Sequence, residues 1–153
     1  MNIKCIAIGN RIMKDDGIGI SIAEAIKEKL HKEDILVVIC ETDFDYALNE
    51  LNNVDLLFII DSSFSNIEPG SITMTSIDDQ IESREQIYSQ HQINLIDLIM
   101  KYKIPIKGYI IGIEIAEISY GLQLSDCLSE HFTQICDEVY NLIIKTGEEI
   151  KNA

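Results

Sequence analysis

Short apolar runs alternate with longer amphipathic segments along the first part of the chain. The runs lie at residues 3–8, 35–39 and 56–60. Uninterrupted apolar runs of this length are typical of strands that are buried on both faces of a sheet. Between the first two runs, apolar residues recur every four positions at Ile18, Ile22, Ile26 and Leu30. This spacing predicts a helix that buries one apolar stripe, so the segment is expected to fold as strand, helix and strand.

The alternation of strands and helices continues towards the C-terminus. Residues 43–51 form a weaker helix pattern, residues 106–113 a fourth apolar run, and residues 125–146 a long amphipathic helix. Buried strands that alternate with helices pair in parallel, and right-handed crossovers place the helices on both faces of the sheet. The expected fold class is therefore α/β, a three-layer αβα sandwich with a mostly parallel, twisted sheet.

The stretch after the third strand, residues 62–90, is too long for a simple loop. It contains the turn sequence Glu68-Pro69-Gly70, followed by an alternating segment at residues 71–75. This alternation predicts an edge strand, which we expect to run antiparallel to its neighbour. Residues 78–89 are polar, and we expect them to form a mobile segment.

The composition bounds the size and class of the protein. The 153 residues suit one domain, residues 1–153, and the hydrophobic fraction of 46% is sufficient for a buried core. The formal net charge of −14 disfavours binding to nucleic acid or to an anionic membrane. The apolar runs are shorter than a signal-peptide core or a membrane span, so we expect a cytoplasmic location. Cys5, Cys40, Cys127 and Cys136 form no CxxC pair and are expected to be buried thiols.

Acidic residues follow two of the predicted strands, at the edge where parallel α/β sheets bind their ligands. Asp15 and Asp16 lie in the loop after the first strand, and Asp61 directly follows the third. We expect Asp15 to cap the following helix and Asp16 to point into the crevice. Asp61 ends an apolar strand, where a carboxylate needs water, a backbone donor or a ligand. A functional role is therefore favoured for Asp61.

A histidine is predicted to join these carboxylates. Ser89 and Gln92 have the spacing of a capping box, which predicts a helix over residues 89–102. This helix leads back to a parallel strand, so its first turn, with His91, is expected at the same edge of the sheet. On spacing alone, an exposed histidine without a function is the favoured interpretation of His91.

Together, Asp16, Asp61 and His91 offer two oxygen donors and one nitrogen donor. This donor set suits a borderline divalent ion such as Zn²⁺ or Ni²⁺ and leaves coordination positions for water or substrate. Without a metal, the two carboxylates could instead share a proton and act as an acid–base pair. The sequence is compatible with both arrangements.

Other catalytic classes lack their motifs in this chain. The glycines after the first strand do not have the GxGxxG spacing, and there is no GxxxxGK[ST] loop, so no nucleotide cofactor is expected. Ser62 and Ser63 are not part of a GxSxG elbow, which disfavours a serine hydrolase. Cys40 has acidic neighbours that would not activate its thiol, and we interpret it as structural.

Several short motifs occur in a fixed order along the chain. They are Gly9-Asn10, Asp15-Asp16-Gly17-Ile18-Gly19, Asp61 followed by Glu68-Pro69-Gly70, His91-Gln92, and Ile111-Gly112-Ile113. In their order and spacing, these motifs resemble the hydrogenase maturation endopeptidases of nickel-iron hydrogenases. The resemblance covers nearly the whole chain.

The resemblance implies a peptidase that removes a short C-terminal extension from the precursor of the hydrogenase large subunit after nickel insertion. It also implies that the residues matching Asp16, Asp61 and His91 bind the metal and form the catalytic site. The ion is then the nickel of the precursor itself, and the precursor is the partner of this protein.

Two positions depart from the family's pattern. Glu114-Ile115 stands where the family usually has Gln-Pro, and Cys40-Glu41-Thr42-Asp43-Phe44-Asp45 replaces a glycine-rich turn. Both are expected to border the crevice, so they bear on which precursor is processed. Two alternative functions use residues of the predicted site, Asp15, Asp16 and Asp61 in one case and Asp16, Asp61 and His91 in the other. One is a receiver-like domain that accepts a phosphoryl group on Asp61 beside Mg²⁺, and the other is a non-catalytic nickel metallochaperone.

Overall fold

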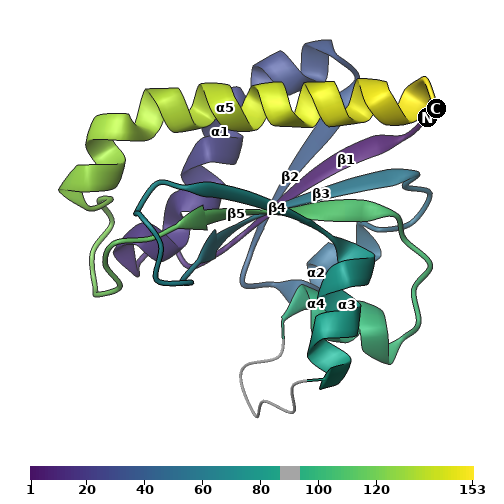
Figure 1. Cartoon of the computed structure of the whole chain (residues 1–153), viewed down its shortest axis with the longest axis horizontal. Helices are drawn as coiled ribbons and strands as arrows, with labels where there is room; N and C mark the ends of the chain where they lie inside the picture. Colours follow the sequence, from purple (N-terminus) through teal and green to yellow (C-terminus); the bar gives the residue numbers. More distant parts are fainter. Residues whose placement is uncertain (87–93) are drawn as a thin grey trace.

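Five strands form one sheet that has helices on both faces (Figure 1). The computed structural model describes residues 1–86 and 94–153. The strands are β1 (Ile3–Ile8), β2 (Ile35–Glu41), β3 (Leu56–Ser63), β4 (Ile72–Ser76) and β5 (Gly108–Glu114). The helices are α1 (Ile18–Lys32), α2 (Phe44–Asn49), α3 (Ile77–Gln86), α4 (Leu95–Lys101) and α5 (Asp126–Lys151), with a 3-10 helix η1 (Lys14–Gly17) before α1.

The strand order is β2-β1-β3-β5-β4. The pairs β1–β2, β1–β3 and β3–β5 are parallel, and β4 pairs with β5 in antiparallel orientation at the edge of the sheet. The predicted αβα sandwich, with a mostly parallel sheet and one antiparallel edge strand, is therefore confirmed.

Two apolar layers hold the helices on the sheet. In β3, Phe58 and Ile60 pack on the side of α1 and α5, whereas Leu57 and Ile59 pack on the side of α2, α3 and α4. Successive side chains of a strand point to opposite faces, so a strand with helices on both sides must be apolar at every position. This requirement explains the uninterrupted apolar runs in the sequence.

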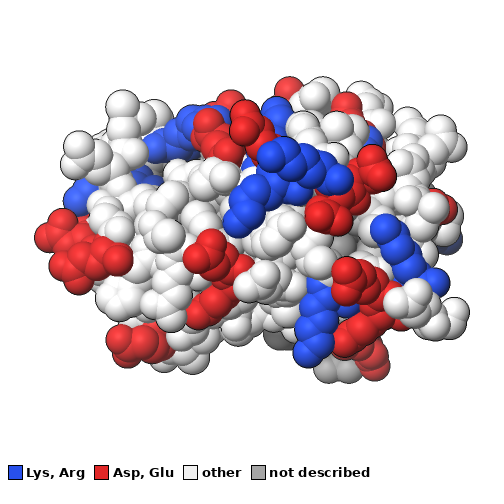
Figure 2. All heavy atoms as spheres, turned by 90° about the horizontal axis from the view of Figure 1, so that it is seen from above, with Lys and Arg blue, Asp and Glu red and all other residues white. Residues whose placement is uncertain are grey.

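The layer formed by α1 and α5 mixes both signs of charge on its outward side. Figure 2 shows Lys and Arg side chains lying among Asp and Glu side chains on this face. Lys29 of α1 lies over the ring of Tyr140 of α5, with its ammonium 4.5 Å from the ring centroid. The excess of acidic residues therefore does not make this face uniformly acidic.

Among the described residues, no helix combines the length and apolar character that a membrane span requires.

The described part of the segment expected to be mobile, residues 78–86, belongs to the helix α3, which follows β4 directly. The helix is polar and has acidic residues in its first turn, where the helix dipole favours them. It is anchored by Ile77, which is buried in the layer under α3 and α4, and by the partly buried Ile81. Two apolar contacts are too few to produce a clear helical pattern in the sequence.

The predicted helix over residues 89–102 begins later than expected, at Leu95. Asn94 has an extended backbone and forms a reciprocal capping box with Asp97, which accounts for the start of α4. The expected capping pair Ser89 and Gln92 lies outside the described residues. His91 also lies outside them.

The first turns of α1 lie in backbone contact with the end of β3. A Cβ atom at Gly19 would lie 2.7 Å from the carbonyl oxygen of Ile60 and 3.3 Å from the Cα of Asp61. Glycine is therefore required where α1 crosses the strand. This close packing places η1 and its aspartates next to the strand end that carries Asp61.

Gly19→Ala is expected to destabilise the protein by about 1–3 kcal/mol, because the added methyl group must push α1 away from β3. Gly147→Ala is the matched control, since a Cβ atom there would make an ordinary contact of 3.5 Å with Cδ1 of Ile3. Alanine is the better helix former by up to about 1 kcal/mol, so the control should be at least as stable as the wild type. Urea unfolding measures both variants, and an equal loss in both would contradict the argument.

Candidate functional site

Two adjoining pockets open at the carboxyl edge of the sheet. The first has a volume of about 550 Å³, and its described lining is Ile8, Gly9, Asp16, Thr42, Phe44, Asp61, Ser62 and Asn94. We call it the acidic pocket. The second has a volume of about 410 Å³ and extends from Asp61 across β5 to β4. Asp61, Ser62 and Asn94 line both pockets, so the two meet at the end of β3.

Ser62 connects the two aspartates of the acidic pocket. Its hydroxyl donates a hydrogen bond of 2.6 Å to Oδ1 of Asp16, and its backbone N–H donates one of 2.7 Å to Oδ1 of Asp61. The backbone N–H of Asn10 donates to Oδ2 of Asp16 at 3.0 Å. Both carboxylates are half-buried, and these bonds fix the directions in which their oxygens face the pocket. The structure thus brings Asp16 and Asp61 to one pocket, with Asp16 facing the crevice.

The sequence motifs do not predict the linking role of Ser62, because it belongs to none of the catalytic serine patterns. Side chains alternate along β3, so the Ser62 hydroxyl points to the face opposite the Asp61 side chain, where Asp16 lies. The one available signal is a hydroxyl residue directly after the aspartate that ends an apolar strand.

A third ligand is required to complete the proposed metal site. Among the described residues, no group of three His, Cys, Asp or Glu side chains could hold a metal ion. His91, the expected nitrogen donor, lies outside the described residues. The described oxygen donors, Asp16 and Asp61, fit a hard or borderline cation by their chemistry.

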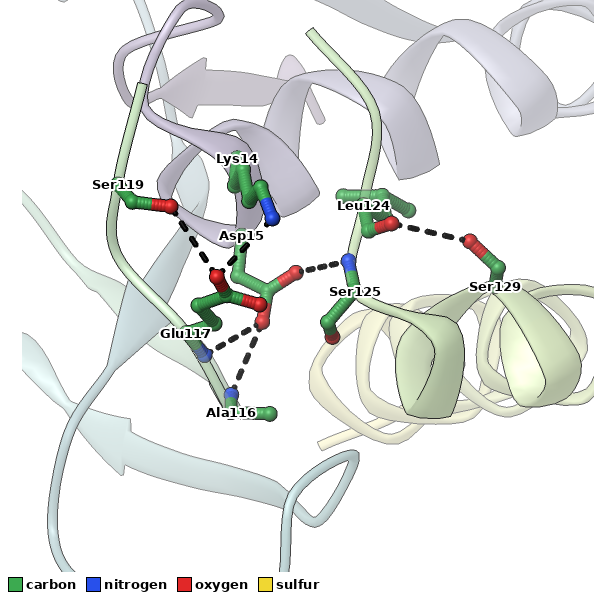
Figure 3. Close-up of polar contacts among 8 residues, drawn as sticks. All are labelled: Lys14, Asp15, Ala116, Glu117, Ser119, Leu124, Ser125 and Ser129. Carbon is green, nitrogen blue, oxygen red and sulfur yellow. Dashed lines mark hydrogen bonds and ion pairs between the residues drawn. The ribbon is translucent and has the colours of Figure 1, made fainter. Parts of the chain in front are cut away.

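Asp15 does not cap α1, contrary to expectation. The N-cap of α1 is Gly17, which has no side chain that could bond to the first turn of the helix. The Asp15 carboxylate is fully buried and accepts three backbone hydrogen bonds, from Ala116 at 3.0 Å, Glu117 at 2.8 Å and Ser125 at 2.7 Å (Figure 3). It therefore ties η1 to the segment that joins β5 to α5.

A second set of contacts reinforces this connection at the surface. The Lys14 ammonium lies 3.0 Å from a carboxylate oxygen of Glu117, and the Ser119 hydroxyl donates to the same oxygen (Figure 3). These hydrogen bonds lower the pKa of Glu117, with the bond from Lys14 as the main cause. The backbone N–H of Lys14 also donates to the carbonyl of Gly121 at 2.9 Å. The loop after β5 is thus attached to the loop after β1 along its length.

One family departure borders the crevice and the other does not. Thr42 and Phe44, from the segment that replaces the glycine-rich turn, line the acidic pocket. Glu114, expected at the crevice, is 1% exposed and lines neither pocket. Its carboxylate accepts backbone N–H bonds from Ser65, at 2.9 and 3.0 Å, and from Ile67 at 3.4 Å. Glu114 therefore holds the loop between β3 and β4 in place through these hydrogen bonds.

The cysteines have no visible catalytic role at this edge. Cys5, Cys40 and Cys136 are buried as expected, whereas Cys127 is only half-buried. Burial raises the pKa of Cys40 to about 12, and the charges of Glu50 and Asp43 add to the effect. Its thiol is therefore protonated at neutral pH, in agreement with a structural role.

Sequence comparison assigns the family. The family model for hydrogenase maturation protease, HycI, matches residues 20–146. The chain belongs to the hydrogenase maturation protease family. In this maturation protease, the matched segment includes Asp61 and His91 and begins after Asp16. No curated protein shows significant sequence similarity to the chain.

Solved structures of similar fold carry related names. The hydrogenase maturating endopeptidase HybD from E. coli matches with a TM-score of 0.76 and 19% identity, over 96% of this chain and 94% of that one. The [NiFe] hydrogenase maturation protease HycI from Thermococcus kodakarensis matches with a TM-score of 0.73 and 21% identity, over 94% and 91%. HybD from Thermococcus kodakarensis matches with a TM-score of 0.62 and 23% identity, over 93% and 99%. These similarities support the fold.

The topology of the maturation protease argues against the receiver-like alternative. Receiver domains of the doubly wound type have five parallel strands in the order 2-1-3-4-5. Here the fourth strand lies at the edge and is antiparallel, and β3 reaches it without a crossover helix. The family assignment likewise favours a peptidase.

Asp15→Asn is expected to lower the free energy of unfolding by about 2–4 kcal/mol. An asparagine amide has one acceptor oxygen and would point its N–H₂ group at one set of buried backbone donors. Glu117→Gln removes a carboxylate from the same loop but only at its exposed end, so thermal unfolding should change little. Thermal or urea unfolding of the two variants checks this order. A stable Asp15→Asn protein would show that the buried carboxylate is dispensable.

Proposed function

We propose that this maturation protease removes the C-terminal extension of a nickel-iron hydrogenase large-subunit precursor after nickel has been inserted. The chain belongs to this family, and one observation on its structure supports the proposal. Asp16 and Asp61, from separate parts of the sequence, line one pocket at the carboxyl edge of the sheet and are linked through Ser62.

The nickel of the precursor is proposed to be recognised by Asp16, Asp61 and His91. Two carboxylate oxygens and an imidazole nitrogen suit Ni²⁺ and leave coordination positions for the precursor's own ligands. A precursor without nickel would lack this contact, so the protease would bind it more weakly. The recognition of loaded precursor is then a direct result of using the substrate's metal as part of the binding surface.

Hydrolysis requires that water adds to the carbonyl carbon of the scissile peptide, that the C–N bond breaks, and that the leaving nitrogen takes up a proton. A carboxylate beside the peptide can take a proton from the attacking water and return it to the nitrogen. The precursor's nickel supplies polarisation of the carbonyl or of the water. Ser62 keeps both carboxylates in place through its hydroxyl and its backbone N–H.

Asp61→Asn is expected to reduce cleavage of a nickel-loaded precursor by about 100-fold or more, because the substituted side chain can neither ligate as an anion nor accept a proton. The fold should persist, since the amide oxygen can still accept the N–H of Ser62. Asp34→Asn removes the same charge at an exposed position with a φ of 59°, which asparagine tolerates. Mass spectrometry of the precursor measures cleavage, and normal cleavage by Asp61→Asn would refute the assignment.

Nickel-loaded precursor is expected to bind the wild-type protein at least about tenfold more tightly than nickel-free precursor, and His91→Ala should remove most of this difference. Binding assays with the two forms of the precursor test recognition separately from cleavage. Equal affinity for both forms would contradict nickel recognition. Tight binding of loaded precursor without any shortening would instead identify a metallochaperone.

A further inference from the structure

The second pocket lies between the sheet and the helices α3 and α4, which contribute Gln80 and Leu95 to its described lining. Its floor follows the register of the strands, because Asp61 of β3 pairs with Gly112 of β5, which in turn pairs with Thr73 of β4. The next row contains Ile59, Ile110 and Thr75, all of which line the same pocket. The pocket is therefore a groove that runs across the strands and away from Asp61.

Gly112 of β5 lies at the middle of this groove. A Cβ atom at this position would lie 2.9 Å from Oγ1 of Thr73 and 3.2 Å from Cβ of Ser63. Glycine therefore lets the side chains of Thr73 and Ser63 approach each other over β5, and both residues line the pocket.

The described lining of the groove combines polar, mostly uncharged residues with apolar ones. The polar residues are Ser62, Ser63, Ser65, Thr73, Thr75, Gln80 and Asn94, and the apolar side chains are Ile8, Ile59, Leu95, Ile96 and Ile110. Asp61 is the charged residue in its described lining. A volume of about 410 Å³ lies within the range of ligand-binding pockets, about 300–1,000 Å³. We call this groove the hydroxyl pocket.

A peptidase must hold its substrate on both sides of the bond that it cleaves. The acidic pocket and the hydroxyl pocket meet at Asp61 and Ser62, so a chain crossing this junction would have one part in each pocket. The hydroxyls and amides of the second pocket are matched to the N–H and C=O groups of an extended chain and to small or uncharged polar side chains. Within its described lining, Asp61 is the residue that could pair with a charged side chain.

We propose that the hydroxyl pocket binds the precursor segment on one side of the scissile bond, through hydrogen bonds from Thr73 and Thr75 to an extended, uncharged stretch of the chain. This inference rests on the proposed function and adds a substrate-binding surface to it. The pocket contributes to binding of the segment, whereas the bond is cleaved at the junction beside Asp61.

Glu114 supports one wall of this pocket without lining it. Its buried carboxylate holds the N–H groups of Ser65 and Ile67, and its Oε1 also lies 3.3 Å from the Ser63 hydroxyl. The loop that follows β3 is thereby kept at the rim of the pocket. Glu114 is thus a positioning residue for the binding surface.

The double variant Thr73→Val and Thr75→Val tests the proposal. Valine keeps the shape and strand preference of threonine and removes only the hydroxyl groups. The Thr73 hydroxyl makes one weak contact within the protein, 3.5 Å to the carbonyl oxygen of Gly112, so the fold should persist. The matched control is Met74→Leu, which changes the intervening residue of β4, whose sulfur contacts Thr146 of α5 on the opposite face.

With nickel-loaded precursor, the double variant is expected to raise KM about tenfold while kcat stays within about twofold, because the lost hydrogen bonds serve binding. The control should leave both constants unchanged. Two synthetic peptides, one with the residues before the scissile bond and one with the residues after it, are then used as competitive inhibitors. One of them should inhibit the wild type and lose about tenfold in potency against the double variant, which identifies the segment held.

The outcomes separate the two proposals. If the wild type cleaves the precursor but the double variant has an unchanged KM, or loses kcat alone, the assignment of the hydroxyl pocket is wrong and the proposed function stands. If neither peptide distinguishes the wild type from the double variant, the assignment is also overturned. If the wild type does not shorten the loaded precursor, the proposed function fails and this inference fails with it.

Discussion

The candidate site depends on a buried carboxylate that faces away from the pockets. Asp15 accepts backbone hydrogen bonds from residues 116, 117 and 125, more than a hundred positions away along the chain. A buried carboxylate without partners is strongly unfavourable, so the loops that supply its donors are held at the position of η1. Asp16 is the next residue, and its direction is therefore set by the partners of Asp15. Two adjacent, identical side chains thus have separate roles, one in fixing the loops and one in the acidic pocket.

Close backbone packing supplies the second constraint. Gly19 lets α1 approach the end of β3, so the loop after β1 and the end of β3 form one surface. Ser62 then reaches Asp16 with its hydroxyl and Asp61 with its backbone N–H. On the other side of the sheet, Asp61 and Gly112 line the second pocket together with Leu95 of α4. The acidic pocket therefore depends on the glycine that lets α1 approach β3, and the second pocket depends on how α3 and α4 pack on the sheet.

The sequence predicts the layers of this fold well, because burial on both faces of a strand or on one face of a helix leaves a regular pattern. The sequence predicts other features less well when they depend on a few buried contacts or on partners that are distant along the chain. The start of α4 depends on the capping box formed by Asn94 and Asp97. Ser89 and Gln92 have the same spacing further upstream, so the sequence alone favours an earlier start. The separate roles of Asp15 and Asp16 depend on backbone groups that no local pattern contains. Convergence of Asp16 and Asp61 was predictable because parallel strands end at a common edge.

The position of Glu114 shows how a departure from the family pattern can affect specificity rather than chemistry. Its carboxylate provides both oxygens to a loop that would otherwise have unpaired N–H groups beside a buried strand end. Glu114 lines neither pocket, but it bonds to Ser63 and Ser65, which line the second one. Thr42 and Phe44, from the other departure, line the acidic pocket on the side away from β4. Both departures therefore act on the pocket walls or directly beside them, and Glu41 of the second also accepts the N–H of Gly9, next to the loop that orients Asp16.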